Sequence, residues 1–183
     1  RGHTVAAQPG GDVELTIDQN IQYIVEKVVD DLIETHAARG AWVIVQKIRT
    51  GEILAMASRP AYDLNAFGSA TDDERLNRAI GVVFEPGSTF KIAVFSAALN
   101  DGIVAPETVI DCENGWWMYA NRPLRDVTGH SELTVADGLK KSSNILSAKL
   151  ALKLGDERFE SYLRAFGIGS ALGIDLPGEE NGI

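Results

Sequence analysis

A helix that is apolar on almost every side but carries one lysine constrains this chain more than any other feature. The break Glu85-Pro86-Gly87-Ser88 is followed by an apolar run at helical spacing over residues 89–99, and Asn100-Asp101-Gly102 predicts its end. A helix that is apolar all round is normally buried. Lys91 lies near the start of this run, so its amine needs either an exit to solvent or a partner in a cleft.

Ser88 and Lys91 are three residues apart at this helix start and therefore lie on one face of it. Backbone amides at a helix N-terminus can stabilise an oxyanion, and a neighbouring lysine with a lowered pKa can accept a hydroxyl proton. The pair is a candidate nucleophile and base for acyl transfer. The same residues are also compatible with a serine that caps the helix and a lysine that lies in solvent.

A second candidate group, Ser142-Ser143-Asn144, interrupts a helical region. Thr134 begins one predicted helix, and residues 144–154 are predicted to be helical again. Ser142 or Ser143 could be an ordinary cap of the second helix. Alternatively, Ser142 relays a proton and Asn144 binds the backbone of a substrate.

The amino-terminal half predicts a helix followed by a hairpin. Residues 16–19 have the spacing of a capping box and begin an amphipathic helix that Gly40 ends. Residues 41–48 and 52–58 are rich in strand-forming side chains and flank a turn at Arg49-Thr50-Gly51. Their incomplete alternation predicts a sheet that helices cover on both faces.

Further elements are predicted from the same kinds of pattern. A short helix is expected within residues 72–80, and another over residues 156–166 that Gly167 ends. Residues 103–131 are predicted to be irregular. Within them, the aromatic run at residues 116–119 is interpreted as a cover over the helical part rather than as the wall of a substrate groove.

Composition and charge exclude several classes of protein. The 17 basic and 26 acidic residues give a net charge of −9, which argues against a nucleic-acid partner. No apolar run approaches the ~20 residues that span a bilayer. His3, His36 and His130 have no partners at metal-ligand spacing, and phosphate-loop and dinucleotide motifs do not occur, so neither a metal nor a cofactor is predicted. The single cysteine, Cys112, excludes an intramolecular disulfide and is interpreted as a buried residue rather than a nucleophile.

The two candidate groups, with the segments around them, resemble a known superfamily. Ser88-x-x-Lys91, followed 54 residues later by Ser142-x-Asn144, is similar to the motifs of penicilloyl-serine transferases, which include penicillin-binding transpeptidases and serine β-lactamases. The chain resembles class B penicillin-binding proteins, and most closely the septal, division-type peptidoglycan D,D-transpeptidases, in the segments GDVELTIDQNIQ, TGEILAMASRPAYDLN, FEPGSTFKIAVFSAAL, ELTVADGLKKSSN and GIDLPGE.

This resemblance implies a fold and four roles. The fold class is α+β, a truncated penicillin-binding transpeptidase (β-lactamase-like) fold with a helical subdomain and part of a central antiparallel sheet. Ser88 is implied as the acylated nucleophile and Lys91 as the base that activates it. Ser142 is implied as the shuttle that brings a proton to the leaving group. Asn144 is implied to bind the acyl-donor amide and to hold Lys91.

The family's third motif, Lys-Thr-Gly or Lys-Ser-Gly, does not follow Ser142-x-Asn144 in this sequence. Arg49-Thr50-Gly51 precedes the nucleophile and is interpreted as a turn. Residues 1–12 are polar and contain the break Gln8-Pro9-Gly10-Gly11, so we expect them to be a linker from an absent amino-terminal region. Residues 13–183 are expected to be the amino-terminal portion of a transpeptidase domain, weakly active or inactive alone, with a Lys91 that water reaches and keeps protonated.

The resemblance also implies partners and a location. The partners are peptidoglycan stem peptides, β-lactam antibiotics and, through the parent protein, proteins of the divisome. The parent is expected on the periplasmic face of the inner membrane, held by an anchor that this sequence lacks. Two alternatives remain open: a β-lactamase or β-lactam sensor of the same superfamily, and a non-catalytic interaction module of the divisome.

Overall fold

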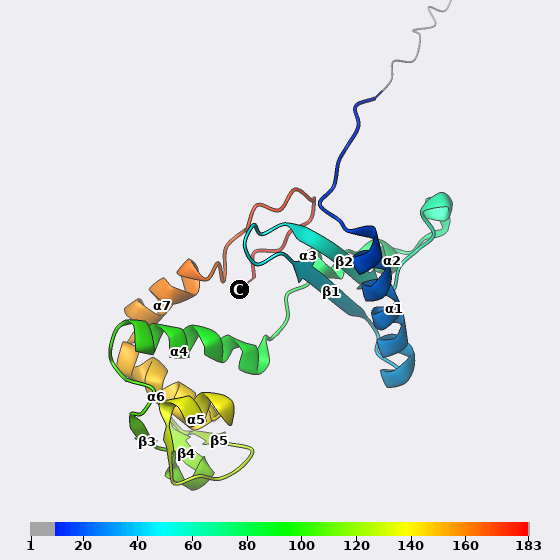
Figure 1. Ribbon diagram of the computed structural model, residues 1–183. Coiled ribbons are helices and arrows are strands. Elements are labelled where there is room, and N and C mark those ends of the chain that lie inside the picture. Colours follow the sequence, from blue (N-terminus) through cyan, green and yellow to red (C-terminus); the bar gives the residue numbers. More distant parts are fainter. Residues whose placement is uncertain (1–9, 183) are drawn as a thin grey trace, which may run out of the picture. The chain divides into compact units, whose positions relative to one another are not determined.

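The computed structural model describes residues 10–182, which divide into two compact units between Val82 and Val83 (Figure 1). Most of the expected linker, residues 1–9, lies outside the described residues. The first unit contains α1 (Gln19–His36), β1 (Ala41–Gln46), β2 (Ile53–Arg59), η1 (Leu64–Ser69), α2 (Asp72–Arg75) and α3 (Arg78–Gly81). The second contains η2 (Gly87–Phe90), α4 (Lys91–Asn100), β3 (Val109–Asp111), η3 (Glu113–Gly115), β4 (Trp116–Tyr119), β5 (Arg122–Arg125), β6 (Glu132–Thr134), α5 (Val135–Lys140), α6 (Asn144–Leu154) and α7 (Asp156–Ala165).

In the first unit, α1 packs along the hairpin that β1 and β2 form (Figure 1). Two valines of α1 are buried against two alanines of β2: Val25, Val29, Ala55 and Ala57. The predicted hairpin is confirmed, and Arg49-Thr50-Gly51 is its turn. Gly51 has a φ of 79°, a left-handed conformation that glycine adopts without strain.

Gln22 of α1 closes the outer edge of β2. Its side-chain amide donates to the Met56 carbonyl at 3.0 Å, and its side-chain carbonyl accepts from the Met56 N–H at 2.8 Å. These two backbone groups point away from β1 and would otherwise be free to pair with another strand. The helix is therefore held to the sheet by directed hydrogen bonds as well as by apolar contact.

On the opposite face of this sheet, α3 and the segment before it contact the strands of the first unit. The Ser58 hydroxyl accepts from the Arg78 N–H at 3.1 Å and donates to the Leu76 carbonyl at 3.4 Å. Ile44, on the same face, remains 43% exposed. The prediction of helices on both faces is right for the α1 side and only partly right for the other. The helix predicted within residues 72–80 is two four-residue helices, because the backbone is extended between them.

The ends of α1 also differ from the prediction. Asp18, and not Thr16, caps the helix, since its carboxylate accepts from the backbone N–H groups of residues 20 and 21 at 2.9 and 3.0 Å. The Thr16 hydroxyl instead donates to the Ile53 carbonyl at 2.6 Å, because the chain before the helix still runs beside β2. The helix ends at His36, where Ala37 is left-handed with a φ of 47°, so Gly40 does not end it.

The second unit is built around α4, as its apolar pattern predicts. Five side chains of α4 besides Lys91 are buried: Ala93, Val94, Phe95, Ala97 and Ala98. Side chains from the strands and from α6 complete the core, among them Ile110, Leu133, Leu146 and Leu150. The helix begins with the 3₁₀ turn η2, and neither η2 nor α4 has a side-chain cap. Ser88 is therefore not a helix cap.

Residues 103–131 are more regular than predicted. They contain β3, β4 and β5, and β3 pairs with β6. Strands of three or four residues give too short an alternation to recognise in a sequence. The β4–β5 turn places Ala120 and Asn121 at positive φ, the geometry of a tight hairpin turn.

The aromatic run at residues 116–119 is interpreted from the sequence as a cover over the helical part. The Lys149 amine of α6 lies 5.2 Å from the Trp117 ring centroid, so this interpretation is right for Trp117. Trp116, however, remains 48% exposed.

The helices α5, α6 and α7 agree with the sequence patterns. The Thr134 hydroxyl caps α5 and the Ser143 hydroxyl caps α6. The predicted burial of Cys112 is also confirmed, and burial raises the pKa of its thiol. Among residues 10–182, no helix combines the length and apolar character that crossing a bilayer requires.

Gly138 allows α5 and α6 to approach closely. A Cβ atom at this position would lie 2.4 Å from Cδ1 and 3.1 Å from Cγ of Leu146, whose side chain is fully buried. We expect Gly138→Ala to lower the free energy of unfolding by about 1 kcal/mol or more, although alanine is the better helix former, because overpacking costs about 1–3 kcal/mol. Urea unfolding followed by circular dichroism measures this change.

The control is the same change in a Leu146→Ala background. Removing the leucine side chain costs about 2–5 kcal/mol by itself but leaves room for the new methyl group. Gly138→Ala is expected to be neutral or stabilising there. An equal loss in both backgrounds would show that the contact with Leu146 is not the reason for the glycine.

Candidate active site

The four residues singled out in the sequence lie together in the second unit. Ser88 belongs to η2, and Lys91 is the first residue of α4. Ser142 lies in the connection from α5 to α6, and Asn144 is the first residue of α6. The cluster therefore lies where the starts of α4 and α6 meet. Ser88 and Lys91 come from α4 and the 3₁₀ turn before it, and Ser142 and Asn144 come from α6 and the connection before it.

Lys91 is the centre of this cluster. Its amine donates to the Ser142 carbonyl at 2.5 Å, to the Ser142 hydroxyl at 2.8 Å and to Oδ1 of Asn144 at 2.7 Å. An ammonium group has three protons to donate, so these acceptors satisfy it completely. Only 9% of the residue is exposed. The interpretation of Lys91 as a solvated surface lysine is therefore wrong.

Ser142 connects Lys91 to Ser88. Its hydroxyl lies 2.9 Å from Oγ of Ser88 and 2.8 Å from the Lys91 amine. The hydrogen bonds that connect Ser88 to Lys91 therefore pass through Ser142. Ser88 is exposed and Lys91 is buried, so the chain of polar groups runs from the surface to a covered amine.

The position of Ser142 depends on an uncommon backbone conformation. Its φ is 56°, in the left-handed region that costs a residue with a Cβ about 1 kcal/mol or more. In this conformation both its carbonyl and its hydroxyl reach Lys91. Ser143 is the residue that caps α6, which leaves the Ser142 hydroxyl available for other contacts.

Burial lowers the pKa of the Lys91 amine below its usual value of 10.5, and the negative charge of Asp126 opposes this effect in part. Desolvation disfavours a charged group, whereas a nearby opposite charge favours it. The expectation that water reaches Lys91 in this chain and leaves its pKa unperturbed is therefore wrong. The helix starts and the α5–α6 connection cover the amine without any residue beyond those described.

Sequence reasoning missed two residues at the end of β5. The Arg125 carbonyl accepts from Nδ2 of Asn144 at 2.8 Å. The Asp126 carboxylate accepts from the Ser143 hydroxyl and from the Asn144 N–H, both at 2.6 Å, and from the Ile145 N–H at 3.1 Å. Neither residue belongs to a motif, and both lie in the segment predicted to be irregular.

An apolar cavity of about 340 Å³ adjoins the cluster. Its wall contains Lys91 and Asn144 together with Gly87, Phe90, Val94, Leu124, Ser147, Ala148, Ala151 and Phe159.

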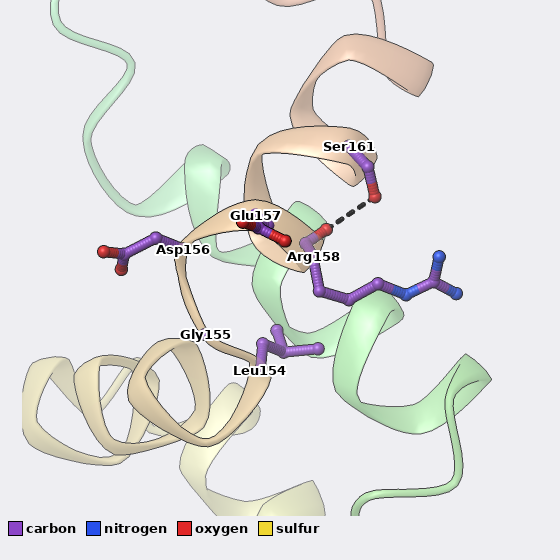
Figure 2. A pocket seen from close by; sticks show the side chains of 6 residues that line it. All are labelled: Leu154, Gly155, Asp156, Glu157, Arg158 and Ser161. Atoms are coloured by element: carbon purple, nitrogen blue, oxygen red, sulfur yellow. Dashed lines mark hydrogen bonds between the residues drawn. The ribbon is translucent and has the colours of Figure 1, made fainter.

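A larger hollow of about 570 Å³, at the junction of α6 and α7, is lined by other residues altogether (Figure 2). There the Ser161 hydroxyl donates to the Arg158 carbonyl at 2.7 Å (Figure 2), so this serine has the ordinary role of a helix side chain.

Within residues 10–182, no group of three or more histidine, cysteine, aspartate or glutamate side chains could hold a metal ion. What the cluster can do is move a proton. A hydroxyl at the surface, a second hydroxyl behind it and a buried amine at hydrogen-bond distances form a path for general-base activation of a serine.

A surface serine, a second serine and a buried lysine joined in this order form the arrangement that the Ser-x-x-Lys and Ser-x-Asn motifs predict. Residues 41–183 match the penicillin binding protein transpeptidase domain, and the chain belongs to this family. It is 35% identical to the probable peptidoglycan D,D-transpeptidase PenA of Neisseria gonorrhoeae and 32% identical to the peptidoglycan D,D-transpeptidase FtsI of Escherichia coli. Each alignment covers 97% of this chain and 30% of the relative. The chain thus spans about a third of the length of these relatives.

Solved structures agree with the relatives. A crystal structure of penicillin-binding protein 3 from Mycobacterium tuberculosis in complex with aztreonam has a TM-score of 0.84 and 32% identity to this chain. The match covers 91% of this chain and 38% of the other. The predicted fold class is confirmed, as is the resemblance to class B penicillin-binding proteins.

The lowered pKa of Lys91 has a measurable consequence for stability. The unfolded chain binds the Lys91 proton more tightly than the folded chain does, so stability rises with pH between the folded pKa and 10.5. We expect the free energy of unfolding of the wild type to increase through this window relative to Lys91→Gln. Urea unfolding of both proteins at a series of pH values measures the difference. A difference that does not change with pH would show that Lys91 titrates as it does in water.

Proposed function

We propose that this chain is the amino-terminal portion of the catalytic domain of a peptidoglycan D,D-transpeptidase, which forms an acyl-enzyme on Ser88 and is acylated there by β-lactams. The observation that carries the proposal is the continuous set of hydrogen bonds from Ser88 through Ser142 to the buried amine of Lys91. Membership of the transpeptidase family supports the same reaction.

In the proposed reaction, Lys91 acts in its neutral form as the base. It takes the proton of the Ser142 hydroxyl as Ser142 takes the proton of Ser88, and Oγ of Ser88 attacks the carbonyl carbon of the acyl donor. Backbone N–H groups at the start of the nucleophile helix have no partner within the helix and can stabilise the oxyanion. When the tetrahedral intermediate collapses, the proton returns through Ser142 to the amine that leaves.

The second half of the reaction uses the same groups in reverse. The amine of a second stem peptide attacks the Ser88 ester, and Lys91 receives its proton through Ser142. When this tetrahedral intermediate collapses, the bond between the acyl carbon and Oγ of Ser88 breaks, and Ser88 takes the proton back through Ser142. Asn144, held between Lys91 and the Arg125 carbonyl, is proposed to keep the base in place and to bind the amide backbone of the donor. A β-lactam carbonyl is attacked in the same way, but its amine stays attached to the acyl group.

The division of the chain follows from this proposal. Residues 1–12 are proposed as a linker from an amino-terminal region, and residues 13–183 as the first part of the transpeptidase domain. The Lys-Thr-Gly motif, with the second oxyanion donor and the groups that bind the substrate carboxylate, is proposed to lie in residues beyond this chain. The parent protein is proposed to act at the periplasmic face of the inner membrane, with division proteins as its partners.

Acylation by a fluorescent penicillin tests this function. In the complete parent protein we expect stable labelling that Ser88→Ala abolishes. Ser161→Ala is the matched control, because its hydroxyl donates to the Arg158 carbonyl of its own helix, and it is expected to label at the wild-type rate. The 183-residue chain is expected to be slower than the complete protein by about 10²–10³-fold or more, because loss of one oxyanion donor alone has this effect.

Three results would contradict parts of the proposal. Rapid release of the label would indicate a β-lactamase instead. No labelling of the complete protein would indicate a non-catalytic module. Equal second-order rates for the short chain and the complete protein would show that residues 1–183 already hold a full site. Mass spectrometry of the labelled protein locates the adduct, which is expected on Ser88.

A further inference from the structure

Asp126 bonds to the first residues of α6, next to the cluster, and has no part in the proposed reaction itself. It follows the last residue of β5 and is half-buried. One carboxylate oxygen accepts from the backbone N–H groups of Asn144 and Ile145, and the other accepts from the Ser143 hydroxyl. A carboxylate at a helix N-terminus stabilises the unpaired amides there and is favoured by the helix dipole.

These contacts determine how the two functional residues are presented. Ser143 also caps α6, since its hydroxyl accepts from the Leu146 N–H at 3.0 Å. With residues 143–145 held by Asp126, the backbone must turn at Ser142, which takes the left-handed conformation. The adjacent Arg125 carbonyl accepts from Nδ2 of Asn144 and so directs Oδ1 of that amide toward Lys91.

We propose that Asp126 is a positioning residue, whose carboxylate holds the first turn of α6 in the one arrangement in which Ser142 and Asn144 both reach Lys91. The inference rests on the proposed function, because the value of the arrangement is the proton path from Ser88. The strain at Ser142 is maintained by hydrogen bonds on its carboxyl-terminal side, of which Asp126 accepts three.

The charge of Asp126 has a separate effect on the base. The side chains that bond the Lys91 amine, from the α5–α6 connection and from α6, are the neutral Ser142 and Asn144. Asp126 is the charged group within residues 10–182 that raises the Lys91 pKa against the effect of burial. Removing this charge without changing the hydrogen bonds is expected to lower the Lys91 pKa further and to favour the neutral base at lower pH.

Two substitutions separate the positioning from the charge. Asp126→Asn removes the charge, while its amide can still accept from the two backbone N–H groups and donate to the Ser143 hydroxyl. Asp126→Ala removes both. The matched controls are Asp137→Asn and Asp137→Ala, because the Asp137 carboxylate also accepts from a hydroxyl at a helix start, that of Thr134 at 3.1 Å. Within residues 10–182, no hydrogen bond joins this carboxylate to the cluster.

The first readout does not depend on activity. In the 183-residue chain, NMR-detected hydrogen exchange of the Asn144 and Ile145 amides is expected to accelerate about tenfold or more in Asp126→Ala, because each loses a bond to a charged group. Asp137→Ala leaves these amides unchanged. The Lys91 pKa, followed by NMR of the amine, is expected to fall in Asp126→Asn and to stay the same in Asp137→Asn.

The second readout is the acylation rate of the complete protein as a function of pH. Asp126→Ala is expected to lose on the order of 100-fold at every pH, the effect of a misplacement of about 1 Å. Asp126→Asn is expected to keep a rate near that of the wild type, with the acidic limb of its profile moved to lower pH. A merely structural aspartate would lower the amount of folded protein and leave the shape of the profile unchanged.

The outcomes separate this inference from the proposed function. If the wild-type protein is not labelled at all, the proposed function fails, and amide exchange and the Lys91 pKa still decide the role of Asp126. If Asp126→Ala is labelled as fast as the wild type, or if neither substitution changes the two amides or the Lys91 pKa, the inference is wrong. Should Asp126→Ala not fold, Asp126→Asn carries the test through the pKa and the pH profile.

Discussion

The second unit depends on the burial of one amine. Lys91 begins a helix that is mostly apolar and buried, and its amine donates to the Ser142 carbonyl, the Ser142 hydroxyl and the Asn144 side chain. An amine without these acceptors would be costly at this position. With them, the amine joins the start of α4 to the start of α6. The hydrogen bonds that satisfy the buried amine are therefore also the ones that bring the four candidate residues together.

The strands of the second unit serve as a support for this interaction. The β4–β5 hairpin is short and partly exposed, and it contributes little to the core. Its end nevertheless places the Arg125 carbonyl and the Asp126 carboxylate against the first turn of α6. The unfavourable backbone at Ser142 is tolerated because the residues on both sides of it are held. The hydrogen bonds that hold the first turn of α6 thus also keep Ser142 in its strained conformation.

Each unit also relies on a side chain that bonds to the backbone of another element. Gln22 pairs with both backbone groups of Met56 at the edge of β2, and Asp126 pairs with the amides that begin α6. Such bonds satisfy groups that secondary structure leaves free. All four residues of the predicted site belong to the second unit, so the hydrogen bonds from Ser88 through Ser142 to Lys91 lie within it. The match to solved transpeptidases nevertheless extends over 91% of the chain.

The sequence by itself determined the long elements and the candidate site residues. Periodicity over ten or more residues identified α1, α4, α6 and α7, and the motif spacing identified Ser88, Lys91, Ser142 and Asn144. Only the tertiary structure decided which atoms meet: that Ser142 lies between Ser88 and Lys91, that Lys91 is covered, and that Asp126 and Gln22 bond to backbone far along the chain. Short strands and long-range hydrogen bonds leave no periodic signal, because their partners are set by packing rather than by neighbouring residues.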